Sequence, residues 1–139
     1  MRDENCVFCK IITGEIGSTP VYEDDAVFAF LDIRPNNPGH TLVVPKNHYR
    51  NIFDIEDGDM KELSVRVKKI ASAVKEGVSA DGINIAMNNE LAAGQLVFHA
   101  HIHVIPRFEN DGYKHWSGKP YKDGEAEIVA EKIKKQINK

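Results

Sequence analysis

Residues 99–105 read HAHIHVI, with three histidines at alternate positions of an otherwise apolar run. The β-branched residues of this run are typical of a half-buried strand. Successive side chains of a strand point to opposite faces, so we predict that His99, His101 and His103 share one face. Each neutral imidazole needs a donor and an acceptor partner, and an unmatched one costs ~1–3 kcal/mol. Three such rings side by side therefore indicate a functional site rather than an ordinary core.

Two kinds of site fit three histidines on one strand face. They could converge on a metal such as zinc, or a neutral histidine could attack phosphorus while its neighbours hold the phosphate oxygens. Gly94 and Gln95 lie just upstream and offer a small residue and an amide donor where a phosphate approaches. No carboxylate is close to the histidines in the sequence, whereas a hydrolytic metal centre needs a general base. These observations favour the nucleophilic histidine, and a catalytic metal centre stays as the competing reading.

The rest of the sequence predicts an α+β fold. Hairpin-like strands, then one long amphipathic helix, then a second pair of strands favour a five-stranded antiparallel sheet with the helices on one side. The expected strands are Val21–Glu23, Ala26–Ile33, 40–48 (ended by Pro45), 82–89 and 96–108. The expected helices are a short segment within Cys6–Ile16, a long one over 59–78 and a C-terminal one over 126–139, which follows a loop over 109–125.

Composition limits the possible partners. A chain of 139 residues with 42% hydrophobic residues suits one domain with its own core. The 18 basic and 21 acidic residues are nearly balanced, which argues against a nucleic-acid-binding surface. We see no apolar run long enough to cross a bilayer and no signal peptide, so we expect no membrane partner and a cytoplasmic location. In that reducing compartment Cys6 and Cys9, spaced C-x-x-C, are more typical of metal ligands or a redox pair than of a structural disulfide.

Four segments together resemble the bacterial and archaeal branch of the histidine triad (HIT) family. They read CVFCKIITGEI, VYEDDAVFAFLDI, PGHTLVVPKNH and AGQLVFHAHIHVIPR, and the resemblance covers roughly residues 5–108. It implies one HIT domain over 1–139, a HIT-like fold and a homodimer. It also implies a nucleotide hydrolase or nucleotidyl transferase. Such an enzyme acts on the α-phosphate of purine nucleoside phosphoramidates or dinucleoside polyphosphates through a nucleotidyl-histidine intermediate.

The resemblance assigns roles to individual residues. His101 would be the nucleophile, and His103 would contact the phosphate oxygens and the leaving group. His99 would lie behind them, and His40 matches a fourth histidine near the triad. Asp32 would hold the ribose hydroxyls of an AMP- or GMP-type nucleotide. Asn88 and Gln95 would lie at the phosphate or ribose, and the base pocket would consist of Phe8, Ile11, Phe30, Leu31 and Ile33.

The resemblance also supplies partners for the two cysteines. In zinc-bearing members of the branch the ligands match Cys6, Cys9, His48 and His99, a closed set typical of one structural zinc per chain. The chemical step would then need no metal. Leu96 departs from the family, because many relatives carry serine or threonine directly after the Gly-Gln pair. The loss of that hydroxyl leaves an alternative open, namely a nucleotide-binding regulatory protein with little turnover.

Overall fold

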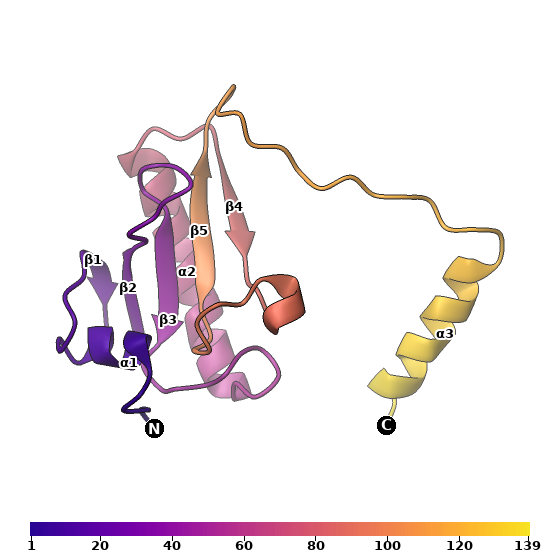
Figure 1. Cartoon of the computed structure of the whole chain (residues 1–139), viewed down its shortest axis with the longest axis horizontal. Coiled ribbons are helices and arrows are strands. Elements are labelled where there is room, and N and C mark those ends of the chain that lie inside the picture. Colours follow the sequence, from indigo (N-terminus) through magenta and orange to yellow (C-terminus); the bar gives the residue numbers. More distant parts are fainter.

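The computed structural model describes residues 1–139 and contains the predicted five-stranded antiparallel sheet, in the order β1-β2-β3-β5-β4 (Figure 1). Its fold class is α+β, as predicted. The strands are β1 (Pro20–Glu23), β2 (Val27–Leu31), β3 (Thr41–Pro45), β4 (Gly82–Ala86) and β5 (Ile102–Arg107). The helices are α1 (Val7–Ile12), α2 (Asp57–Gly77) and α3 (Glu125–Ile137), with a short 3-10 turn η1 (Leu91–Ala93).

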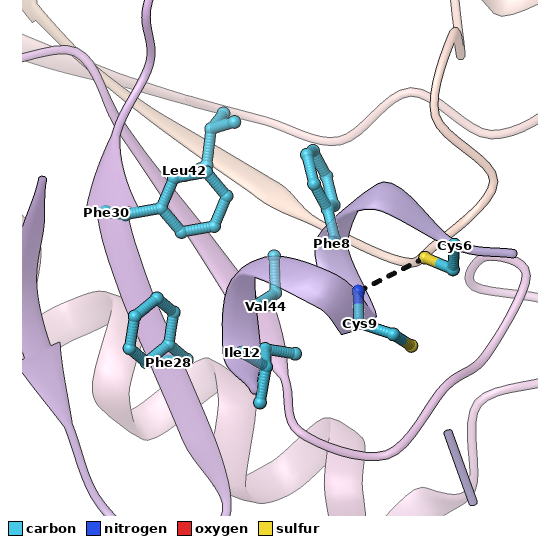
Figure 2. Packing of buried hydrophobic residues seen from close by; sticks show 8 residues of the cluster. All are labelled: Cys6, Phe8, Cys9, Ile12, Phe28, Phe30, Leu42 and Val44. Carbon is cyan, nitrogen blue, oxygen red and sulfur yellow. Dashed lines mark hydrogen bonds between the residues drawn. The ribbon is translucent and has the colours of Figure 1, made fainter. Parts of the chain in front are cut away.

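Helices cover both faces of the sheet, so the prediction of helices on one side is wrong. Alternate residues of β2 and β3 point in opposite directions. Phe28 and Val44 pack with α1 in one buried cluster, which Figure 2 shows from close by. Ala29 and Val43 pack with α2 in a second cluster on the other face. The sequence concealed this arrangement because α1 is only six residues long and its apolar residues fit several packings.

The histidine-rich segment is less regular than predicted, because β5 begins only at Ile102. The ladder between β3 and β5 stops at the pair Val43–Ile102. Two residues further along, Pro45 has no N–H to donate, so the ladder cannot continue there. The carbonyl oxygen of Pro45 instead accepts a hydrogen bond from the ring of His99 at 2.8 Å. His99 and His101 therefore lie in an extended segment that leads into the strand.

The C-terminal segment extends away from the sheet. In Figure 1 the chain after β5 leads outward, and α3 stands apart from the other elements. None of the residues of α3 is buried, although Ile133 and Ile137, four residues apart, give it an apolar side. No helix of the chain is both long enough and apolar enough to cross a bilayer.

Candidate functional site

The three histidines of the HAHIHVI segment lie on the face of the sheet that α1 covers, and His99 and His101 contact Phe8 of α1. His103 pairs with Leu42 of β3, whose side chain belongs to the cluster on the α1 face. His99 is fully buried, His101 is 6% exposed and His103 is half-buried. The ring centroids of His101 and His103 are 5.0 Å apart. The three histidines therefore share one face, as predicted, although only His103 belongs to a strand.

The hydrogen bonds of His101 define which of its nitrogens is free. Its Nδ1 lies 2.7 Å from the carbonyl oxygen of His99. A carbonyl oxygen can only accept, so Nδ1 carries the proton and Nε2 keeps its lone pair. A neutral imidazole with a free Nε2 is the form that can act as a nucleophile.

His103 and His40 form a second ordered pair. The backbone N–H of Asn36 donates to Nδ1 of His40 at 3.1 Å, so the neutral ring of His40 carries its proton on Nε2. That Nε2 lies 2.9 Å from Nδ1 of His103 and donates to it. His103 consequently has its proton on Nε2, where it can donate to a bound group.

Burial keeps these rings neutral near pH 7. Desolvation lowers the pKa of His101 and of His40 below the usual value of 6.5, and Asp32 opposes the shift in both. Desolvation, together with the neighbouring His101 and His40, lowers the pKa of His103 to about 4. Desolvation also lowers the pKa of His99 to about 4. The hydrogen-bonding pattern of neutral histidines therefore applies over the physiological range.

A cavity of ≈ 460 Å³ opens beside His101 and His103. Its floor is apolar, and Ile33 lies at its exposed mouth. Asp32 and Asn88 provide polar groups on its wall. The predicted site residues that line it are Phe8, Ile11, Phe30, Asp32, Ile33, Asn88, His101 and His103.

Two predicted pocket residues lie elsewhere. Leu31 follows Phe30 in β2 and therefore points to the α2 side of the sheet, so it does not line the cavity. Gln95 is buried, and both of its amide hydrogens are used, by the carbonyl oxygens of Arg50 at 2.7 Å and Val97 at 3.1 Å. The expectation that Gln95 donates to a phosphate is therefore wrong. It holds the loop in front of the histidine segment instead.

The C-x-x-C pair meets two histidines, as the resemblance implied. The sulfur of Cys9 lies 3.5 Å from Nδ1 of both His48 and His99, and the sulfur of Cys6 lies 3.4 Å from Nδ1 of His99. The two Nδ1 atoms are 3.2 Å apart. All four groups converge on one point, and both thiols are free.

The geometry of this cluster fits a tetrahedral metal. Ligand atoms around a zinc ion are roughly 3.3–3.8 Å apart, given bond lengths of ~2.0–2.3 Å. The Nε2 atom of His99 donates to Pro45, so its Nδ1 faces the two sulfurs with a lone pair and no proton. Two thiols and two imidazole nitrogens are a donor set that zinc prefers.

A carboxylate lies closer to the triad than the sequence indicated. Asp32 is far from His103 along the chain, but its carboxylate oxygen is 3.7 Å from Nε2 of His40. Asp32, His40 and His103 thus form a second group of potential ligands. The 2.9 Å contact between His40 and His103 is, however, a direct hydrogen bond with a proton between the nitrogens. The expectation that no carboxylate lies near the triad is therefore wrong. The hydrogen bond between His40 and His103, rather than a lack of carboxylates, argues against a catalytic metal ion at this group.

A family comparison decides the relationship of the chain. Residues 13–110 match the model of the HIT domain. The chain belongs to the HIT family. An uncharacterized HIT-like protein of Methanocaldococcus jannaschii is 51% identical over 107 residues, which are 77% of this chain and 82% of the relative. The adenylylsulfatase HINT3 of Arabidopsis thaliana is 41% identical over 107 residues, 77% of this chain and 54% of the plant protein.

Solved HIT structures share the fold. The structure of SMU.412c from Streptococcus mutans superposes with a TM-score of 0.93 at 44% identity, covering 98% of this chain and 87% of the other. A zinc-bound histidine triad protein from Mycobacterium smegmatis superposes with a TM-score of 0.76 at 36% identity, covering 96% of each chain.

Sequence reasoning missed several neighbours of this HIT site. Val7, Ser18 and Arg34 also line the cavity, although none was singled out by its residue type. The backbone N–H of Asn36, which orients His40, carries no side-chain signal at all. The Pro-Asn-Asn-Pro-Gly run at 35–39 has a composition typical of a loop, and the structure gives this loop a role in the site, because Asn36 orients His40.

Proposed function

We propose that this protein is a nucleotide hydrolase or nucleotidyl transferase that uses His101 as its nucleophile. The observation that carries the proposal is the 2.7 Å hydrogen bond between Nδ1 of His101 and the carbonyl oxygen of His99. This bond leaves Nε2 as the free, unprotonated nitrogen of a ring that lines the cavity. The substrates are purine nucleoside phosphoramidates or dinucleoside polyphosphates, attacked at the α-phosphorus.

The cavity suits a nucleoside monophosphate. A purine base occupies the apolar part formed by Phe8, Ile11, Phe30 and Ile33. The carboxylate of Asp32 accepts hydrogen bonds from the ribose hydroxyls, and it already accepts one from the backbone N–H of Arg34 at 2.8 Å. Charge-assisted hydrogen bonds of this type are stronger than neutral ones. The α-phosphate then lies at His101.

The reaction has two steps. Nε2 of His101 attacks the α-phosphorus, and the bond from phosphorus to the leaving group breaks as the nucleotidyl-histidine forms. The Nε2–H of His103 donates a hydrogen bond to the leaving nitrogen or oxygen, which departs with the bonding electron pair and takes its proton from water. Water, or another acceptor, then attacks the same phosphorus and loses its proton to solvent, which releases the nucleotide and restores His101.

Rigid placement supplies much of the catalysis. The nucleophile and the hydrogen-bond donor are held by hydrogen bonds and a strand, so orientation is settled before substrate arrives. An open groove of ≈ 590 Å³ shares His103 and Asn88 with the nucleotide cavity. We assign this groove to the leaving group. The sulfate leaving group implied by the name of the Arabidopsis relative makes adenylyl sulfate a further donor to test.

We further propose that Cys6, Cys9, His48 and His99 hold one structural zinc ion per chain. When bound, zinc would supply a cross-link between the N-terminal segment and the segment that carries His101. The homodimer, the single HIT domain over 1–139 and the cytoplasmic location are part of the same proposal. The apolar side of α3, free of its own chain, is consistent with a second copy.

The test is release of AMP from adenosine 5′-phosphoramidate, lysyl-AMP and adenylyl sulfate. Wild type is compared with His101→Ala, each with and without a chelator. We expect turnover by wild type, a loss of at least ~1000-fold in the variant, and retained turnover in chelated samples that remain folded. Release of AMP by the variant at the wild-type rate would exclude His101 as the nucleophile.

One observation favours a second candidate function. Leu96 lines the cavity and is 82% exposed, where many relatives carry a hydroxyl. A nucleotide-binding regulatory protein with little turnover would bind AMP at the same cavity. Binding of AMP without product release from any of the three donors would support this candidate over the enzyme.

A further inference from the structure

The carboxylate of Asp111 lies outside the proposed active site and is saturated with hydrogen bonds. It accepts from the Nε of Arg107 at 2.8 Å, from its Nη2 at 3.1 Å, and from the backbone N–H groups of Phe108 and Tyr113 at 3.1 Å. The fifth donor is the side-chain amide of Asn37, also at 3.1 Å. The Asp111 side chain is only 7% exposed. A turn that needed only to reverse the chain would not require a bond to the distant Asn37.

Asn37 fixes the loop that precedes β3. Its amide also donates to the carbonyl oxygen of Pro106 at 2.9 Å, and its own carbonyl oxygen accepts from the backbone N–H of His40 at 3.0 Å. Gly39, with φ +102°, allows this loop to pack closely, because a Cβ there would lie 2.9 Å from Val78. The loop is therefore held from β5 and from the end of α2.

Asn36 connects this loop to the histidines. Its carbonyl oxygen accepts a hydrogen bond from the hydroxyl of Tyr113 at 2.8 Å, and its N–H donates to Nδ1 of His40 at 3.1 Å. The turn around Asp111 thus holds both Asn36 and Asn37. Those two residues determine where the N–H beside His40 points.

We propose that Asp111 is a positioning residue that acts through Asn37 and Asn36 to select the tautomer of His40 and, through it, that of His103. The tautomer assignment stands on hydrogen-bond geometry alone. Its catalytic consequence rests on the proposed function.

The physical reason is that the His40–His103 pair has two proton arrangements. Either Nε2–H of His40 donates to Nδ1 of His103, or Nδ1–H of His103 donates to Nε2 of His40. Both keep one hydrogen bond, so the pair alone does not choose between them. The Asn36 N–H selects the first, because it requires a lone pair on Nδ1 of His40. Only the first leaves His103 with a proton on Nε2 for the leaving group.

The test measures the tautomers directly by ¹H–¹⁵N NMR correlations of the imidazole rings in the full chain. Asp111→Asn keeps the shape of the side chain but replaces one carboxylate oxygen by an NH₂ group. This group faces N–H donors that have then lost their acceptor. Asn37→Ala removes the side-chain amide that links Asp111 to the loop before β3. It is the variant to measure if Asp111→Asn does not fold. The matched control is Asp81→Asn, since Asp81 is an exposed carboxylate that accepts the N–H of Glu109 at 2.8 Å in the same turn.

We expect His103 of wild type and of the control to be protonated at Nε2 alone. In Asp111→Asn and Asn37→Ala we expect a mixture of both tautomers. For donors with a poor leaving group we expect kcat to fall roughly 10- to 100-fold with little change in KM, the scale typical of partners that orient functional histidines.

Unchanged tautomers in both folded variants would overturn the positioning role, whatever happens to turnover. Altered tautomers in a protein that hydrolyses none of the donors would uphold the positioning role and reject the proposed function instead. The NMR signal therefore separates the two failures.

Discussion

The edge of the Phe8 ring meets the imidazole of His101 at 88°, with 5.1 Å between the ring centroids. Phe8 also packs edge-on against Phe30 at 5.4 Å, and it lies in the same short helix as Cys9. One aromatic side chain therefore forms the wall of the cavity and supports the ring that we propose as nucleophile. Edge-to-face pairs of this kind contribute about 0.5–1.5 kcal/mol beyond the area they bury.

Replacing Phe8 by leucine should weaken this support while leaving the chain folded. We expect kcat/KM to fall about tenfold, and the free energy of unfolding to fall by about 1–2 kcal/mol, because the smaller side chain leaves a gap. Steady-state assays and chemical denaturation measure the two quantities. Phe53→Leu is the control, since Phe53 is 76% exposed and lies outside the cavity. An unchanged kcat/KM in Phe8→Leu would show that the contact with His101 does not matter.

Removal of zinc should lower thermal stability rather than stop the chemistry. A ligand that binds only the folded state adds about 4 kcal/mol at a thousandfold excess over its Kd. We therefore expect a chelator to lower the melting temperature of wild type and to have no effect on Cys9→Ser. Circular dichroism during heating, with metal analysis of the same samples, makes the comparison. An equal melting temperature of wild type with and without the chelator would contradict a zinc cross-link.

Acid should affect both stability and turnover in a defined range. The pKa of His103 is about 4 in the folded chain, below its usual 6.5, because burial disfavours the charged ring. Between these values the unfolded chain binds a proton that the folded chain does not. Stability contributed by neutral His103 is therefore complete above pH 6.5 and is lost as the pH falls from 6.5 toward 4.

The same titration sets the pH profile of the reaction. Protonation places a hydrogen on Nδ1 of His103, where it opposes the Nε2–H of His40. We expect kcat/KM to stay level through pH 6.5 and to fall only at lower pH, as measured by initial rates in buffers of constant ionic strength. An acid limb centred at 6.5 or above would mean that the rings are not held neutral.

The ribose hydroxyls should be recognised by Asp32. For Asp32→Asn we expect KM to rise about tenfold for ribonucleotide donors, since a hydrogen bond to a charged group contributes ~1.5–3 kcal/mol. Donors with a 2′,3′-dideoxy sugar should bind the variant and wild type almost equally. Asp25→Asn, in the exposed hairpin turn, is the control. An equal loss with both sugars would place Asp32 in a different role.

Leu96 offers a gain-of-function test. It is 82% exposed at the cavity, so Leu96→Ser should change stability little and should return a hydroxyl beside the phosphate site. One hydrogen bond of ~1 kcal/mol predicts a rise in kcat/KM of about fivefold. Leu91→Ser removes a similarly exposed leucine outside the cavity and should have no effect. A rate that stays level in Leu96→Ser would show that the hydroxyl is not limiting here.

The sequence predicted the parts of this site that depend on local pattern. Alternation placed three histidines on one side, and the C-x-x-C spacing found two of the four potential metal ligands. The start of β5 at Ile102 was not predictable in this way, because it depends on Pro45, a residue of the neighbouring strand. The same limit explains why Asp32, although predicted to bind ribose, was not expected beside the triad. It is distant in sequence from residues 99–105, but it lies 3.7 Å from His40, which bonds to His103. The predictions that Leu31 lines the base pocket and that Gln95 donates to a phosphate were wrong. Both came from the family resemblance, which gives neither the direction of a side chain nor its hydrogen-bond partners.

The potential metal ligands are widely spaced along the chain, at Cys6, Cys9, His48 and His99. During synthesis the two sulfurs leave the ribosome long before the second imidazole exists. A metal ion held by the two cysteines alone would have only half of the coordination that the four groups offer, and it would stay exchangeable until most of the sheet has been made. Closure of the cluster therefore belongs to a late stage of folding. It occurs when the segment that carries His101 first meets the beginning of the chain.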